Sequence, residues 1–245
     1  MNLTWHIIRK DLIYLRWTLL VWGLSYLYLL VQPNLSVSGS VQLRDYLHIF
    51  SLVTFGVLSV ALIMGVVQAD HPNDSRGQWR TRPISAVRMM TAKLLFIGLL
   101  FVALPLLADW LKNQVGATQT MQSFKEYSLF VLMLTSLSLS FVATAACTKN
   151  GAHGLLLWVG LIFATGSLAE GLSRILPRLS LQLSMQMNMN RGLAILAFSA
   201  AIALAVILNQ YLRRRMTASI VLLVVGSVGS ALMGTLWSYY YFYQG

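Results

Sequence analysis

Five basic side chains and one tryptophan lie in a short polar segment, reading A-D-H-P-N-D-S-R-G-Q-W-R-T-R-P-I-S-A-V-R-M-M-T-A-K from Ala69 to Lys93. The basic residues are Arg76, Arg80, Arg82, Arg88 and Lys93, and the tryptophan is Trp79. Guanidinium groups bind carboxylates and phosphates in defined geometries, and tryptophan supplies a large apolar surface. This combination indicates binding chemistry and predicts a docking site for a cytoplasmic partner.

The local sequence predicts an ordered turn followed by a helix. Pro83 fixes its own backbone and restricts Arg82 before it, Ser85 is a suitable N-cap, and a helix follows from Ala86. We expect a short helix across the inner face that displays arginine, methionine and tryptophan. The predicted docking surface comprises Arg76, Trp79, Arg80, Arg82, Pro83, Ile84, Ser85 and Arg88.

Catalytic motifs are absent from the sequence. It contains no G-x-x-x-x-G-K-[ST], no H-E-x-x-H and no G-x-S-x-G, and its four histidines are scattered. We therefore assign no catalytic or metal-binding residue and expect this chain to bind no cofactor. Asp109 and Glu170 lie at predicted outer ends of spans, where they are either solvated helix ends or part of an outer gate.

The composition requires a membrane. Of 245 residues, 57% are hydrophobic and 10% are charged, and the mean hydropathy is +0.68, whereas soluble domains have about 25% charged residues. We predict one transmembrane domain over residues 1–245 and no soluble domain. The net charge of +11 is expected to meet lipid head groups and not nucleic acid. The single cysteine, Cys147, excludes an intrachain disulfide.

Apolar runs predict an all-α polytopic bundle of six to seven transmembrane helices. The expected spans are approximately Leu12–Val31, Tyr46–Gln68, Ala92–Trp110, Tyr127–Cys147, Gly154–Ala169, Gly192–Tyr211 and Thr217–Tyr240. The fifth is short, so it either lengthens by a turn or is partly re-entrant. Small residues recur every four positions in three spans, which predicts close helix packing. These faces are Ser136, Ser140 and Thr144; Ala197, Ala201 and Ala205; and Gly226, Ser230 and Gly234.

Charge at the span ends predicts a cytoplasmic N-terminus, because basic residues concentrate in cytoplasmic loops. Both the 76–93 loop and the Arg213–Arg215 run then lie inside. Seven spans would place the C-terminus outside, after an aromatic cluster over 237–243. Residues 1–11 are predicted to form either an amphipathic helix in the inner interface or the polar start of the first span.

The loop over 69–91 resembles the corresponding loop in permease subunits of ATP-binding-cassette (ABC) exporters of the type-two class. Many members carry an aromatic residue, then R-P-I-S or a near variant, then a lysine at the start of span three. The matching residues are Trp79, Arg82, Pro83, Ile84, Ser85 and Lys93. The resemblance in element order covers roughly residues 1–215. It implies an N-terminal elbow helix, six spans and a cytoplasmic coupling helix.

The resemblance also implies partners: a cytoplasmic ABC ATPase that binds ATP and Mg, a second permease half, as a homo- or heterodimer, and membrane lipid. A bacterial inner membrane is the implied location. The segment 217–240 departs from the family because it adds a seventh span. The chain is then either a subunit with a peripheral helix or the first half of a longer permease. A non-transporting membrane scaffold or accessory subunit is the alternative function, and the substrate cannot be read from the sequence.

Overall fold

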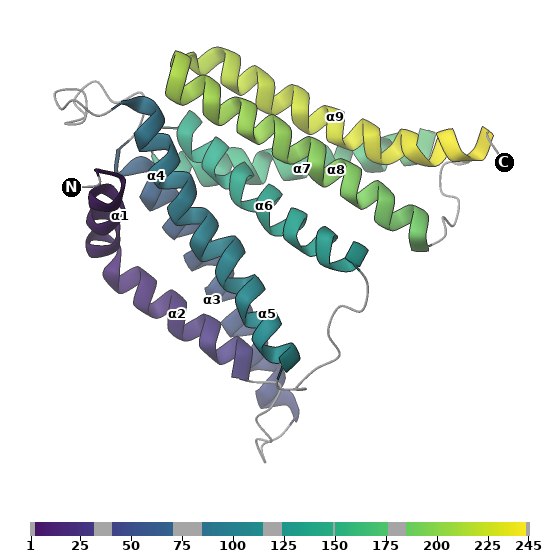
Figure 1. The fold of residues 1–245 in the computed structure, drawn as a ribbon. Helices are drawn as coiled ribbons and strands as arrows, with labels where there is room; N and C mark the ends of the chain where they lie inside the picture. The colour runs from purple at the N-terminus through teal and green to yellow at the C-terminus, as the bar shows by residue number, and fades with distance from the viewer. Residues whose placement is uncertain are drawn as a thin grey trace. The chain divides into compact units, whose positions relative to one another are not determined.

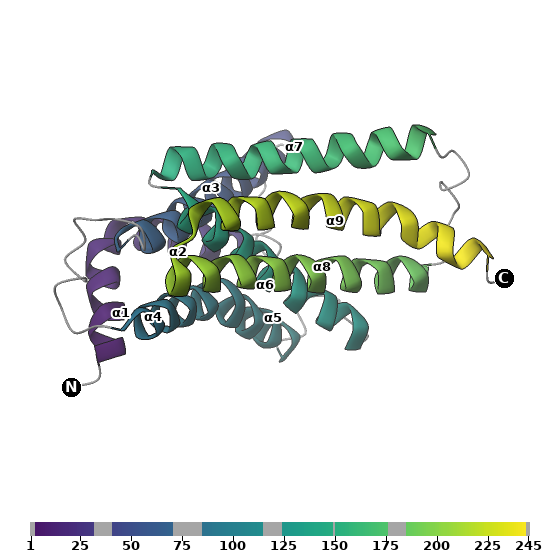
Figure 2. The ribbon, with the colours of Figure 1, turned by 90° about the horizontal axis from the view of Figure 1, so that it is seen from above.

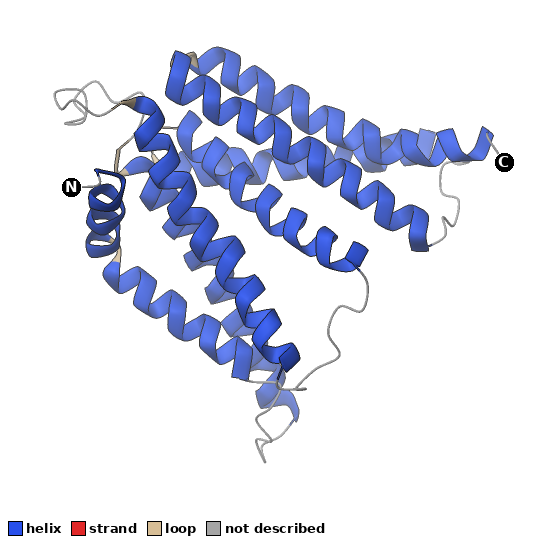
Figure 3. Ribbon diagram, in the orientation of Figure 1, coloured by secondary structure: helices blue, strands red, loops and turns tan. Residues whose placement is uncertain are grey.

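The computed structural model describes residues 3–31, 41–70, 85–114, 124–148, 150–175 and 185–243. These residues form helices joined by short turns, and they contain no strand (Figure 3). The prediction of an all-α protein is therefore confirmed for the described part of the chain. The fold divides into two compact units, one comprising Met1–Asp70 and Gly77–Thr120 and the other His71–Arg76 and Met121–Gly245.

The first unit contains three long helical segments and one short helix that crosses their end. Its elements are α1 (Leu3–Tyr14), α2 (Arg16–Val31), α3 (Val41–Gln68), α4 (Ala86–Gly98), the π-helical turn η3 (Leu99–Ala103) and α5 (Leu104–Gln114). Within this unit, α2 packs on α3 and α1 packs on α4 (Figure 1). The ends of segments distant in sequence are thereby brought together.

The chain bends by 79° between α1 and α2. The bend lies at Leu15, whose buried side chain reaches α3 at Gly65: a Cβ at position 65 would lie 3.1 Å from Leu15 Cδ2. The first long helix therefore begins at Arg16, and the predicted start at Leu12 is wrong by four residues. Residues 3–14 form a separate helix because the anchored Leu15 turns the chain before the apolar run begins.

An aromatic cluster fills the core of the first unit. Trp22 stacks on Tyr26 and Phe55 with ring centroids 5.7 and 5.5 Å away, and Phe101 meets it edge-on at 5.4 Å. The indole nitrogen donates a hydrogen bond of 2.8 Å to Ser59 Oγ on α3. This bond satisfies the one polar atom of a buried tryptophan, which fixes α2 against α3.

The third span begins with the predicted cap. Ser85 has an extended backbone, and its hydroxyl accepts a hydrogen bond of 3.3 Å from the Arg88 backbone nitrogen. The N-cap prediction is confirmed. The helix then continues through Met89 and Met90, which are buried, so these methionines are not displayed as expected. They begin a long span in which the hydrogen bonds change to the π pattern over Leu99–Ala103.

The second unit contains four long helices. They are α6 (Phe124–Cys147), α7 (Gly151–Ile175), α8 (Met185–Leu208), continued by the π-helical turn η5 (Asn209–Arg213), and α9 (Met216–Tyr243). Helix α8 packs between α6 and α9, and α7 packs on α6 and α9 (Figure 2). The predicted fifth span corresponds to α7, which is unbroken and longer than expected at both ends, so it is not re-entrant.

A tight turn joins α8 to α9. Arg214 adopts a left-handed conformation with φ of 55°, which ends η5. The Asn209 side chain donates hydrogen bonds of 3.1 Å to the Arg215 carbonyl and 2.7 Å to Ser219 Oγ. These bonds compensate a conformation that is unfavourable for a residue with a Cβ. The predicted seventh span is confirmed as a helix that starts next to the arginine run.

The predicted small-residue face of α9 does allow close packing. Gly226 meets Ile202 of α8, Gly234 meets Ile195, and Ser230 Oγ lies 3.0 Å from Ser199 Oγ. Close approach through glycine and serine is a common solution for helices in lipid. The predicted alanine face of α8 makes no such contact with α9, and its members are exposed: Ala197, Ala201 and Ala205.

Six helices of the described chain are long and apolar enough to cross a membrane, or seven if α1 and α2 count as one bent span. Many large apolar side chains are exposed along them, including Phe50, Phe163 and Val225. Such surfaces suit contact with lipid and not with water. The protein is thus a multi-pass membrane protein. The side chains of the C-terminal aromatic cluster, 237–243, lie outside the described residues.

Candidate functional site

A buried cluster of charges lies at one end of the first unit. Lys93, near the start of α4, places its ammonium 2.8 Å from Asp11 Oδ2 of α1 and 3.0 Å from Asp70 Oδ2, two residues beyond the end of α3. It also donates a hydrogen bond of 2.6 Å to the Val66 carbonyl. Lys10 completes the cluster by pairing with Asp70 at its outer edge. One lysine therefore connects three helices.

The local structure explains how the cluster forms. The bend at Leu15 directs α1 across the end of the unit, so that Asp11 faces α4. The last turn of α3 is closed by a hydrogen bond of 3.0 Å from the Ala69 nitrogen to the Gly65 carbonyl, and Asp70 follows directly. The Ser85 cap sets the start of α4 two turns before Lys93. Each charged residue is thus fixed by a helix end or a bend.

The ammonium of Lys93 is fully provided with acceptors. It has three N–H donors, and it faces two carboxylates and one carbonyl. The side chains of Lys93 and Asp11 are each 1% exposed, whereas Asp70 is 16% and Lys10 is 48% exposed. The cluster therefore extends from a dry interior at Lys93 to solvent at Lys10. Two ammonium groups face two carboxylates, so its formal charge is zero.

The electrostatics favour the ionised form of Asp70. Burial alone would raise its pKa, but the positive charges of Lys93 and Lys10 and their hydrogen bonds outweigh burial and hold the pKa below its usual value. Asp70 therefore stays a carboxylate and can hold both lysines. Asp11 keeps one oxygen, Oδ1, without a hydrogen-bond partner in the described structure, although Lys10 Nζ is 3.8 Å away.

The structure describes two residues of the predicted docking surface. Ser85 is the N-cap of α4, and Arg88 lies exposed on its first turn, five residues before the buried Lys93. The other predicted members lie outside the described residues: Arg76, Trp79, Arg80, Arg82, Pro83 and Ile84. The described residues on both sides of this loop are connected to the charge cluster. Asp70 is one of its members, and Ser85 caps the helix that carries Lys93.

The predicted outer-gate residues belong to different units. Asp109 is half-buried in the middle of α5, and Glu170 is exposed near the end of α7. Asp109 lies sixteen residues beyond Lys93 in the same span, about 24 Å away along a helix axis. It therefore lies at the opposite end of the first unit from the charge cluster. The assignment of Asp109 and Glu170 to solvated helix ends or to an outer gate stays a prediction.

Sequence reasoning singled out Lys93 but missed its partners. Asp11 lies within the predicted N-terminal segment 1–11, and Asp70 lies within the polar segment from Ala69 to Lys93, and neither pattern indicates a lysine partner. The sequence did offer one signal, which is the small number of acidic residues. The chain has only seven, and Asp11 and Asp70 both lie beside predicted inner ends of spans. An acid beside the membrane that is matched by a lysine at another span end is a candidate buried pair.

No protein-family model, curated protein or solved structure matches this chain. The described residues contain no group of three or more His, Cys, Asp or Glu side chains that could hold a metal ion. The charge cluster links α1, α3 and α4 through ion pairs and a hydrogen bond to the Val66 carbonyl.

Proposed function

We propose that this chain is the permease subunit of an ATP-driven ABC exporter and couples to a separate cytoplasmic ATPase. One observation carries the proposal: the helices on both sides of the 71–84 loop are joined to α1 through Lys93. A force applied to this loop would move the end of α3, the start of α4 and α1 together. A docking loop can transmit movement of a bound partner to the transmembrane helices only if it is firmly connected to them.

In this proposal α1 is the elbow helix and the residues before α4 form the coupling helix. The bend of 79° and the packing of α1 on α4 support the first assignment, since they place α1 beside α4 and out of line with α2. The arginine-rich composition of the loop supports the second. ATP and Mg bind the partner, a second permease half completes the path, and the location is the bacterial inner membrane with a cytoplasmic N-terminus.

The docking test uses variants in the loop. Trp79→Ala combined with Arg82→Ala is expected to abolish co-purification with the cytoplasmic ABC ATPase proposed as the partner, or at least the stimulation of its ATP hydrolysis. Arg213→Ala is a matched control, because it removes a predicted cytoplasmic arginine that is exposed in the second unit. ATPase coupling that survives the double substitution would leave the scaffold function as the better explanation.

The sidedness of the loop can be tested independently of any partner. Because Cys147 is the single cysteine, Cys147→Ala gives a background without thiols. We expect Ser75→Cys in that background to react with an impermeant maleimide in inside-out vesicles only. Thr118→Cys, in the predicted outer loop, should react in right-side-out vesicles only. Labelling of Ser75→Cys from the outside would contradict the cytoplasmic docking site.

A further inference from the structure

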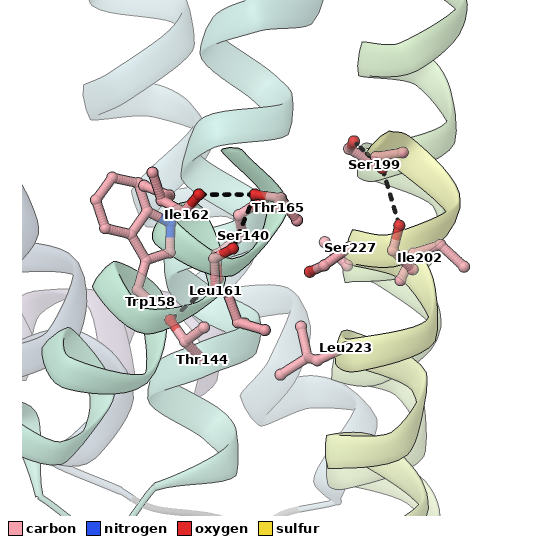
Figure 4. A pocket seen from close by; sticks show the side chains of 13 residues that line it. Ser140, Thr144, Trp158, Leu161, Ile162, Thr165, Ser199, Ile202, Leu223 and Ser227 are labelled. Atoms are coloured by element: carbon pink, nitrogen blue, oxygen red, sulfur yellow. Dashed lines mark hydrogen bonds between the residues drawn. The ribbon is translucent and has the colours of Figure 1, made fainter. Parts of the chain in front are cut away.

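A cavity of about 190 Å³ lies within the second unit, between α6, α7, α8 and α9 (Figure 4). Its lining has two chemical kinds. Trp158 and several aliphatic side chains form an apolar wall, and six hydroxyl groups lie among them. The hydroxyls belong to Ser140, Thr144, Thr165, Ser199, Ser227 and Ser230. All of these residues belong to one unit, and the cavity is partly open, since Ile162 in its lining is exposed.

The cavity hydroxyl groups on α6 and α7 already donate hydrogen bonds to backbone carbonyls of their own helices. Ser140 donates to the Ser136 carbonyl at 2.8 Å, Thr144 donates to Phe141 and Ser140 carbonyls, and Thr165 donates to the Leu161 carbonyl at 2.8 Å. A hydroxyl has one proton but two acceptor positions. These three hydroxyl groups can therefore accept hydrogen bonds from a molecule in the cavity but cannot donate to it.

The opposite wall has the same polarity. Ser230 donates to the Gly226 carbonyl at 2.9 Å, so the 3.0 Å contact with Ser199 uses the Ser199 proton. Ser227 points toward the cavity from α9 (Figure 4). Except at Ser227, the hydroxyl protons of the lining are thus donated within the protein, so the cavity presents more acceptor positions than available protons beside its apolar wall. An excess of acceptors favours a ligand that brings its own donors.

We propose that this cavity is a binding site for a small amphipathic molecule with a neutral hydrogen-bond-donating head, such as a primary alcohol on an aromatic or aliphatic body. The head lies among the threonine and serine oxygens, and the body lies against Trp158, which stacks on Phe141 with centroids 4.3 Å apart. The volume suits roughly eight to ten non-hydrogen atoms, since an engineered cavity of about 150 Å³ in another protein holds benzene. The inference does not rest on the proposed function.

The test compares two probes of equal size on the whole protein in lipid nanodiscs. 2-Phenylethanol carries a hydroxyl donor, and its isomer benzyl methyl ether has only an acceptor. We expect saturable binding of 2-phenylethanol, measured by calorimetry against protein-free nanodiscs, with an affinity about tenfold above that of the ether. Equal affinities, or no saturable binding of 2-phenylethanol, would overturn the proposal.

Variants assign the binding to this cavity. Thr165→Val should weaken 2-phenylethanol binding several-fold and leave benzyl methyl ether unaffected, because the Thr165 proton is already donated to its own helix. Thr135→Val is the matched control, because Thr135 on α6 also donates to a carbonyl of its own helix at 2.8 Å but does not line the cavity. Thermal unfolding of each variant establishes that it is folded. Equal weakening by Thr135→Val and Thr165→Val would contradict this location, whatever the outcome of the ATPase experiments.

Discussion

Replacing Lys93 by methionine is expected to lower the free energy of unfolding by about 3–5 kcal/mol, because it leaves the Asp11 carboxylate buried without its partner. The measurement is unfolding of the purified protein in micelles, followed by the helical signal in circular dichroism. Arg88→Met serves as the control on the same helix. Arg88 is exposed, so its removal should change the free energy by no more than about 0.5 kcal/mol.

A double substitution separates stability from function. Asp11→Ala with Lys93→Met removes both buried charges, and such replacements are often neutral in other proteins, so most of the lost stability should return. The connection between α1 and α4 is nevertheless gone. We expect the double variant to fold and to bind the ATPase but to lose transport coupling. Wild-type coupling in this variant would show that the charge cluster serves folding alone.

Replacing Gly226 by alanine is expected to destabilise the second unit by about 1–3 kcal/mol through overpacking. The new Cβ would lie 2.3 Å from Ile202 Cγ2 and 3.1 Å from Ile202 Cβ. Isoleucine is branched at Cβ and stiff, so it cannot rotate away without moving α8. The higher helix propensity of alanine offsets at most about 1 kcal/mol of this effect.

The same helix supplies a control for this prediction. At Gly234 an added Cβ would lie 3.4 Å from Ile195 Cδ1, which is an ordinary contact, so Gly234→Ala should leave the apparent Tm nearly unchanged. Adding Ile202→Ala to Gly226→Ala should recover part of the stability, because it removes the opposing methyl group. A Gly226→Ala protein as stable as the Gly234→Ala protein would mean that α8 and α9 do not approach this closely.

The sequence predicted the features that depend on local patterns. The long apolar runs located the helices, and the Ser85 cap followed from a serine placed between a proline and a helix-forming segment. The α9 packing face followed from Gly226, Ser230 and Gly234 alone. Each of these depends on neighbouring residues on one element. Local physical rules are therefore sufficient to find them.

The features that the sequence did not predict depend on contacts between distant segments. Lys93 and Asp11 are 82 positions apart, and nothing local to Asp11 shows that it faces a lysine. The start of α2 was misplaced because the bend at Leu15 is fixed by Gly65 on α3. The alanine face of α8 has the right spacing, but the contact with α9 is made by a different face.

The π-helical turn at Leu99–Ala103 divides the third span into two parts. At its end the Leu104 nitrogen bonds the Leu99 carbonyl, five residues back, and Pro105 then follows without an N–H of its own. The usual ladder of backbone bonds is thus interrupted in mid-membrane. Helices kink at π-helical turns and prolines, so this turn is where the half that carries Lys93 would bend against the half that carries Asp109. A displacement at the Lys93 end therefore does not require the whole span to move as a rigid rod.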